Sequence, residues 1–134
     1  MKYYLDTNII IYALNGKYPA VMPHFQQVPS MSIVIPSTVL AEIEYGARKS
    51  RDYGRTIGLY RKFMDYFASE PFDELSAACY GRIRADLEQQ GRVIGANDMM
   101  IAATVMAANG ILVTHNTREF SRIGGLVVED WTQG

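Results

Sequence analysis

The sequence has little cysteine and little histidine. Cys79 is the only cysteine among 134 residues, so no disulfide can form within the chain, and a cytoplasmic setting fits best. The two histidines, His24 and His115, lack the spacing of a zinc site, and no cysteine cluster accompanies them. The sequence therefore excludes a disulfide scaffold and argues against bound zinc.

Long apolar runs are also missing. The longest uncharged apolar run, from Met99 to Ala108, is about half of the ~20 residues that a membrane-spanning helix needs. The N-terminus carries an acid at Asp6 and lacks the charged, apolar and small segments of a signal peptide. We therefore expect no membrane segment.

The chain also lacks a large excess of either positive or negative residues. The formal net charge of −1 does not by itself indicate a nucleic-acid-binding protein. Basic residues are nevertheless grouped in two stretches, one with Arg48, Lys49, Arg51, Arg55, Arg61 and Lys62 and one with Arg82, Arg84 and Arg92. Such groups are usually solvated helix faces, but a basic rim around an acidic centre gives the same near-zero sum. Net charge leaves both interpretations open.

What the chain does contain is an alternation of short apolar strands and amphipathic helices. With 49% apolar and 20% charged residues, it is typical of a globular protein, and its length fits a single domain over 1–134. The pattern predicts strands at 2–5, 32–35, 111–114 and 126–129, and helices at 7–14, 20–27, 37–50, 53–68, 74–90 and from 97 or 98 to about 108. The segment 116–125 is expected to be a loop with one helical turn. Strands separated by helices predict a three-layer α/β domain with a parallel sheet of four to five strands and helices on both faces.

Acidic residues fall where the strands of such a sheet would end. Asp6 directly follows the first strand, and Glu119 follows the strand that ends at Thr114. Asp98 begins a helix that is apolar almost all round and should be buried, so its carboxylate must cap the helix, pair or bind a metal ion. In an open parallel sheet, binding sites form beyond the carboxyl ends of the strands. We therefore expect several carboxylates to meet at one edge of the sheet.

One position remains ambiguous in the predicted helix 37–50. Glu42 and Glu44 flank its apolar face on opposite sides, and periodicity does not choose between them. Carboxylates without a Cys–His cluster suit Mg²⁺ or Mn²⁺. An acidic cluster that binds such ions is suited to metal-assisted cleavage of phosphodiester bonds, often with two ions ~4 Å apart.

Three segments together show a family resemblance. "LDTNIIIYAL", "STVLAEIEYGARKS" and "IGANDMMIAATVMAANGILVTHNTREFSRIGGLVVEDW" resemble the PIN-domain ribonuclease toxins of VapBC-type toxin–antitoxin pairs, in the same order and with specific spacing. The resemblance extends from Lys2 to Trp131. It implies a compact PIN-like α/β fold and an endoribonuclease that depends on Mg²⁺ or Mn²⁺.

The resemblance also assigns residues. It implies that catalysis and metal binding rest on four acids: Asp6, Glu42, Asp98 and Glu119. The fourth departs from the broader family pattern, because Asn116 stands where many PIN domains carry Asp. Three polar residues are expected to support the acids: Thr7, Asn8 and Asn116. Arg48, Lys49 and Arg82 are candidates for contact with the RNA backbone.

The family further implies partners. These are an RNA substrate, which is tRNA for some relatives, a homodimer, and a VapB-type antitoxin whose C-terminal tail occupies the acidic groove in a larger assembly. A phosphatase of the haloacid-dehalogenase type would need a second Asp two residues after Asp6, where Asn8 stands. No G-x-G-x-x-G motif or P-loop is present. The remaining alternative is a PIN-like interaction module that has lost catalysis.

Overall fold

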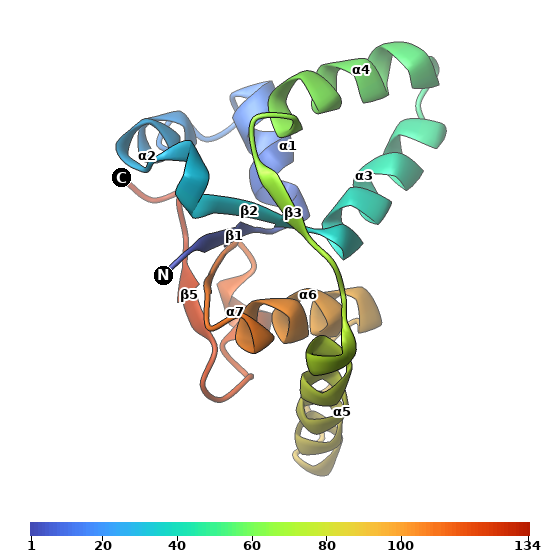
Figure 1. Ribbon diagram of the computed structural model, residues 1–134, viewed down its shortest axis with the longest axis vertical. Helices are drawn as coiled ribbons and strands as arrows, with labels where there is room; N and C mark the ends of the chain where they lie inside the picture. The colour runs from blue at the N-terminus through green and yellow to red at the C-terminus, as the bar shows by residue number, and fades with distance from the viewer.

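The central feature of the fold is a parallel sheet of five strands (Figure 1). The computed structural model describes all 134 residues. The strand order is β3-β2-β1-β4-β5, and every neighbouring pair is parallel. The strands are β1 (Tyr3–Leu5), β2 (Ile33–Pro36), β3 (Ala68–Glu70), β4 (Ile111–Val113) and β5 (Val127–Glu129). Because all strands run the same way, their carboxyl ends lie along one edge of the sheet.

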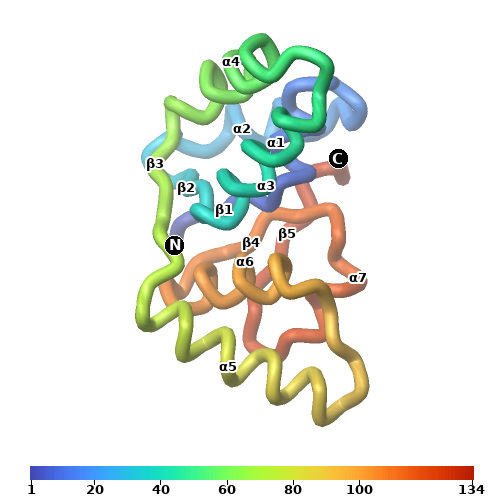
Figure 2. The backbone as a smooth tube through the Cα atoms, turned by 90° about the vertical axis from the view of Figure 1, so that its right-hand side faces the viewer, coloured from blue at the N-terminus to red at the C-terminus, as the bar shows by residue number.

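Helices cover both faces of this sheet, as the sequence predicts. They are α1 (Thr7–Asn15), α2 (Val21–Gln27), α3 (Ser37–Arg48), α4 (Tyr53–Met64), α5 (Glu74–Gln89), α6 (Ala96–Ala107) and α7 (Thr117–Phe120). Figure 2 shows α1 to α4 on one side and α5 with α6 on the other, with the sheet between them. A short 3₁₀ turn, Ser30–Ser32, precedes β2. The three-layer α/β prediction is confirmed. None of the helices has the length and apolarity that crossing a membrane would require.

The fifth strand was not predicted from the sequence. The helix expected over 53–68 ends at Met64, and Ala68 to Glu70 then pair with Val34 to Pro36 of β2. β3 is an edge strand whose first two residues are exposed, so it shows no apolar alternation. Its stability comes from backbone pairing with β2, which leaves no pattern in the side chains.

Two helix starts also differ from the expectation. Ser37 does not cap α3, because Pro36 holds the N-cap position and the Ser37 hydroxyl accepts a hydrogen bond from the Phe72 amide at 3.2 Å. α6 begins at Ala96, after Gly95, so that Asp98 lies inside the first turn. No side chain makes a capping hydrogen bond at the start of α6, so neither Asn97 nor Asp98 caps this helix. The Asp98 carboxylate is therefore free for another role.

The segment after β5 closes the core. Trp131 is 1% exposed, and its ring lies 5.1 Å from Phe25 and 5.5 Å from Tyr3, measured between ring centroids. His24 stacks on the same indole at 5.4 Å. The C-terminal residues are thus packed against β1 and α2.

Candidate active site

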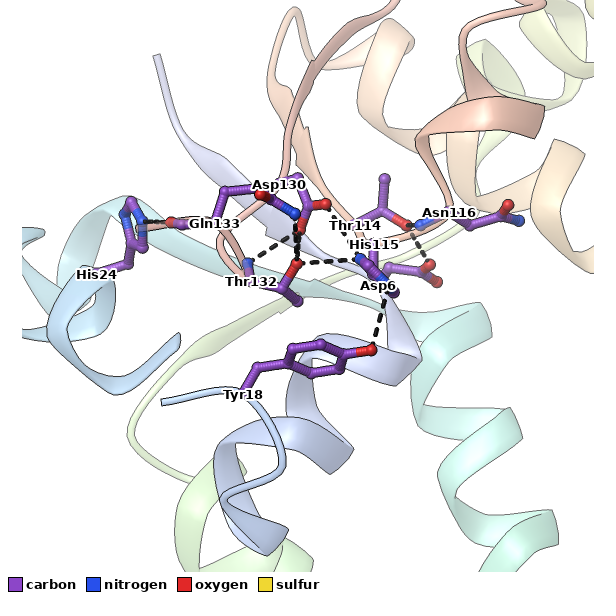
Figure 3. Close-up of polar contacts among 9 residues, drawn as sticks. All are labelled: Asp6, Tyr18, His24, Thr114, His115, Asn116, Asp130, Thr132 and Gln133. Atoms are coloured by element: carbon purple, nitrogen blue, oxygen red, sulfur yellow. Dashed lines mark hydrogen bonds and ion pairs between the residues drawn. The ribbon is translucent and has the colours of Figure 1, made fainter. Parts of the chain in front are cut away.

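Asp6 lies at the carboxyl end of the central strand β1 and is 5% exposed. It is the N-cap of α1, and its Oδ1 accepts a hydrogen bond from the Thr7 amide at 2.8 Å. Its Oδ2 accepts one from the Thr114 hydroxyl at 2.7 Å (Figure 3). The two bonds fix the carboxylate at the sheet edge. Burial raises the pKa of Asp6, the two hydrogen bonds oppose that rise, and the nearby charge of Glu42 adds to it.

Thr114 is the residue at this site that sequence reasoning missed. It is fully buried directly after β4, donates to Asp6 and accepts a hydrogen bond from the Asn116 amide at 3.0 Å. Asn116 therefore approaches the site through its backbone, and its side chain makes no hydrogen bond (Figure 3). The only signal in the sequence was that a polar residue, Thr114, ends an apolar strand. The pairing of that strand with β1 is seen only in the structure.

The structure separates the two acids of α3 that periodicity left ambiguous. Glu42 accepts a hydrogen bond from the Thr7 hydroxyl at 2.5 Å and one from the Asn97 amide group at 3.4 Å. Its charge also reaches Asp6 and Asp98. Glu44 instead pairs with Arg61 at 2.8 Å and accepts from the Tyr53 hydroxyl. Glu42 alone faces the other acids.

Asp98 joins the same group of charges. Burial first, and then the charges of Asp6, Glu42 and Glu119 in that order, together raise the pKa of Asp98 to about 6. The three acids that act on Asp98 come from the end of β1, from α3 and from α7. All four acids that the sequence singled out therefore interact through their charges, with Asp98 affected by the other three. We call Asp6, Glu42, Asp98 and Glu119 the acidic cluster.

No cation of the protein neutralises the acidic cluster. The three salt bridges of the chain, Arg61–Glu44, Arg84–Glu88 and His115–Asp130, lie outside it. No three His, Cys, Asp or Glu side chains are close enough in the structure to hold a metal ion as they stand. The donor set nevertheless fits a divalent cation, because it consists of coupled carboxylate oxygens without a paired charge.

Two other residues expected at the site, Asn8 and Arg82, make no hydrogen bond with the acidic cluster. Asn8 is exposed and its side chain makes no hydrogen bond, although Thr7 contacts both Asp6 and Glu42. Arg82 lines a cavity with Met106, at the end of α6 away from Asp98. Arg82 therefore lies away from the acidic cluster, whereas the role of Asn8 stays a prediction.

The two basic residues at the end of α3 have different surroundings, because Arg48 acts on Glu44 whereas Lys49 lies near Tyr45. The Arg48 guanidinium lies 3.7 Å from the ring centroid of Tyr53, and the Lys49 ammonium lies 5.2 Å from that of Tyr45. Tyr45 lines an open cavity together with Glu42. Lys49 thus extends the site along α3.

His115 has a different environment. Its Nδ1 lies 3.1 Å from Asp130 and 3.0 Å from the Thr132 hydroxyl, and its Nε2 lies 3.3 Å from the Tyr18 hydroxyl (Figure 3). Both ring nitrogens are therefore engaged with the residues that hold the C-terminal segment.

The sequence is similar to that of known proteins over most of its length. The family described as "PIN domain" matches residues 3–126, which is most of the chain. The chain belongs to the PIN-domain family. Its relatives place this PIN domain in the VapC type. It is 39% identical to the tRNA(fMet)-specific endonuclease VapC of Shigella flexneri, over 98% of this chain and 99% of that protein.

Solved structures show the same likeness. The PIN domain superposes with a TM-score of 0.91 and 36% identity on a chain of VapBC2 from Rickettsia felis, solved bound to a DNA fragment from the promoter; the match covers 98% of this chain and 99% of that one. DNA-bound VapBC from Salmonella typhimurium gives a TM-score of 0.91 at 34% identity, with 98% of each chain covered. The expected family and fold are confirmed.

The raised pKa of Asp98 leads to a prediction for the metal-free PIN domain. Because the folded-state pKa is about 6, above the ordinary 3.8, the folded protein binds more protons than the unfolded chain between these values. The contribution of Asp98 to the free energy of unfolding should therefore fall as pH rises from about 4 to about 6, and stay low above that. Urea unfolding in EDTA at pH 5 and pH 7.5 measures the change. Asp98→Asn should show a smaller loss of stability than the wild type, and equal losses would contradict the coupling.

Proposed function

We propose that this PIN domain, acting as a single domain over 1–134, is the toxin of a type II toxin–antitoxin pair and an endoribonuclease that hydrolyses RNA phosphodiester bonds. The observation that carries the proposal is the acidic cluster, in which the charges of three carboxylates act on that of Asp98 and no cation of the protein pairs with them. Relatives named ribonuclease or tRNA-specific endonuclease support RNA, and specifically tRNA, as the substrate class. Cleavage of tRNA would inhibit translation and growth.

The acidic cluster would hold Mg²⁺ or Mn²⁺ through Asp6, Glu42, Asp98 and Glu119. A bound divalent ion supplies charge neutralisation at the phosphate and activation of a water molecule. The hydroxyl groups of Thr7 and Thr114 fix the carboxylates of Glu42 and Asp6, which keeps the oxygen atoms in place before the substrate arrives. Arg48 and Lys49, at the end of α3, would attract the RNA backbone.

The proposal includes protein partners. The structures of the relatives are VapBC complexes, which supports a VapB-type antitoxin for this chain. We propose that the antitoxin's C-terminal tail covers the acidic cluster, that the PIN domain forms a homodimer, and that both join in a larger assembly. The single Cys79 and an RNA substrate favour a cytoplasmic location.

The test is cleavage of total RNA by purified, antitoxin-free protein, with mapping of the cut sites. RNA should be cut in Mg²⁺ or Mn²⁺ and remain intact in EDTA, because the acidic cluster repels phosphate without a cation. Full cleavage in EDTA would refute the metal-dependent mechanism. RNA left intact in Mg²⁺ and Mn²⁺ alike would refute the nuclease.

The same ions should stabilise the protein. Ligands that bind only the folded state raise the melting temperature by mass action. A melting curve of the wild type should shift upward in Mg²⁺, and the shift should largely disappear in Asp98→Asn. An equal shift in both proteins would remove Asp98 from the proposed metal site.

A further inference from the structure

Tyr45 is an aromatic residue that the fold leaves in solvent beside the acidic cluster. Its side chain is 65% exposed, although most other large apolar and aromatic side chains of α3 are packed in the core. It packs against no other aromatic ring of the chain, and its ring lies 5.2 Å from the Lys49 ammonium. It follows Glu42 by three residues, so both side chains project from the same side of α3.

The open cavity that Tyr45 lines also includes Glu42 of the acidic cluster. It has a volume of about 590 Å³, within the roughly 300–1,000 Å³ of typical ligand sites. Its walls come from α3, from the start of α6 and from Thr7 at the start of α1, and the apolar groups of Ala41 and Met100 line it together with Tyr45. Glu42 and Asn97 line the same cavity and are hydrogen-bonded to each other. A nucleotide in this cavity would lie next to the acid that faces the cluster.

We propose that Tyr45 is the stacking surface for an unpaired base of the RNA, one nucleotide from the phosphate at the acidic cluster. This inference rests on the proposed function. The exposed ring and the apolar walls suit the aromatic face of a base. The Lys49 ammonium beside them suits the phosphate to which that base is attached. Single-stranded nucleic acid is generally bound in this way, by aromatic stacking beside basic groups.

The inference specifies the substrate class further. A base can stack on a protein ring only after it has left its own helix, so the site takes single-stranded or loop RNA rather than duplex. Stacking is tolerant of sequence because every base has an aromatic face. Tyr45 should therefore select for unpaired structure, while the choice among bases falls to other contacts.

The experiment compares Tyr45→Ala and Tyr45→Phe with a matched control, Tyr66→Ala. Tyr66 is 76% exposed and lies just after α4, where it lines none of the described cavities. The probe is a single-stranded RNA oligonucleotide that carries one 2-aminopurine, whose fluorescence is quenched when it stacks. Rapid mixing in Mg²⁺ reads the quench before any cleavage, and KM and kcat are then measured on the same oligonucleotide and on its duplex.

Tyr45→Ala should lose the quench and raise KM by roughly 5- to 100-fold, with a smaller change in kcat. Tyr45→Phe keeps an aromatic face and should resemble the wild type, as should Tyr66→Ala. The duplex should be cut poorly by every protein, and Tyr45→Ala should not change that rate.

The outcomes separate this inference from the nuclease proposal. Cleavage by Tyr45→Ala with the wild-type KM and quench would overturn stacking and leave the nuclease intact. A quench that depends on Tyr45, in a protein that cuts no RNA, would support stacking and overturn the nuclease. Equal loss in Tyr45→Ala and Tyr45→Phe would also overturn stacking, because it would show that the hydroxyl group is what matters, as in a hydrogen bond to RNA or a contact with a protein partner.

Discussion

Replacement of Glu42 by glutamine is expected to lower the rate of RNA cleavage by about 100-fold or more, whereas the same replacement at Glu44 leaves the rate unchanged. Loss of a group that stabilises the charges of the reaction typically costs about 10²–10³ in rate. Glu42 belongs to the acidic cluster and is held by Thr7 and Asn97. Glutamine has nearly the same shape as glutamate but lacks the negative charge with which Glu42 would bind a divalent ion.

Glu44 is a matched control because it occupies the same helix, two residues away. Its carboxylate pairs with Arg61 and accepts from Tyr53, and these bonds lower its pKa. An exposed ion pair of this kind contributes little to stability, so Glu44→Gln should stay folded. Single-turnover cleavage of RNA in Mg²⁺ compares the two variants, with circular dichroism as the check on folding. Similar rates for both would remove Glu42 from the catalytic machinery.

The largest effect on stability is expected at the C-terminal segment. Trp131→Ala should lower the free energy of unfolding by about 3–5 kcal/mol, the usual cost of truncating a buried tryptophan to alanine. The indole packs among Tyr3, His24 and Phe25, and its Nε1 donates a hydrogen bond to Glu129 at 3.1 Å. A loss of this size is a large fraction of the roughly 5–15 kcal/mol that holds a typical domain together.

Urea unfolding followed by circular dichroism measures this loss, because Trp131 is the only tryptophan and its fluorescence disappears in the variant. Tyr66→Ala serves as the control, since it removes an aromatic side chain that is mostly exposed. Its midpoint should stay close to that of the wild type. A similar midpoint for Trp131→Ala would mean that the segment after β5 adds little to the stability of the domain.

The sequence predicts the layers of this fold well because helices and buried strands leave periodic patterns. β1, β2 and β4 are continuous apolar runs, and α6 is apolar nearly all round, as its burial in the core requires. β3 leaves no such pattern, since it lies at the edge and is held by backbone hydrogen bonds to β2. Pattern alone therefore identified four of the five strands.

For the site, sequence position predicted the strand-end acid Asp6 but not which partners surround it. The choice of Glu42 over Glu44 came from the family resemblance, and it agrees with where the two side chains point in the structure. Thr114 was read as the end of a strand, because its hydrogen bond to Asp6 joins residues far apart in the chain. Contacts of this kind become visible only when the register of the sheet is known.

The position of β1 in the sheet determines when during synthesis the protein can become active. β1 is made first, yet it lies between β2 and β4, and Asp6 depends on a hydroxyl group from Thr114. Contacts that link the two ends of a chain form late, because the intervening loop must close first. A ribosome that has not yet translated Thr114 therefore carries a nascent chain without an assembled acidic cluster. The domain gains its nuclease site only after almost all of it has been translated, when a co-expressed antitoxin can already be present to bind it.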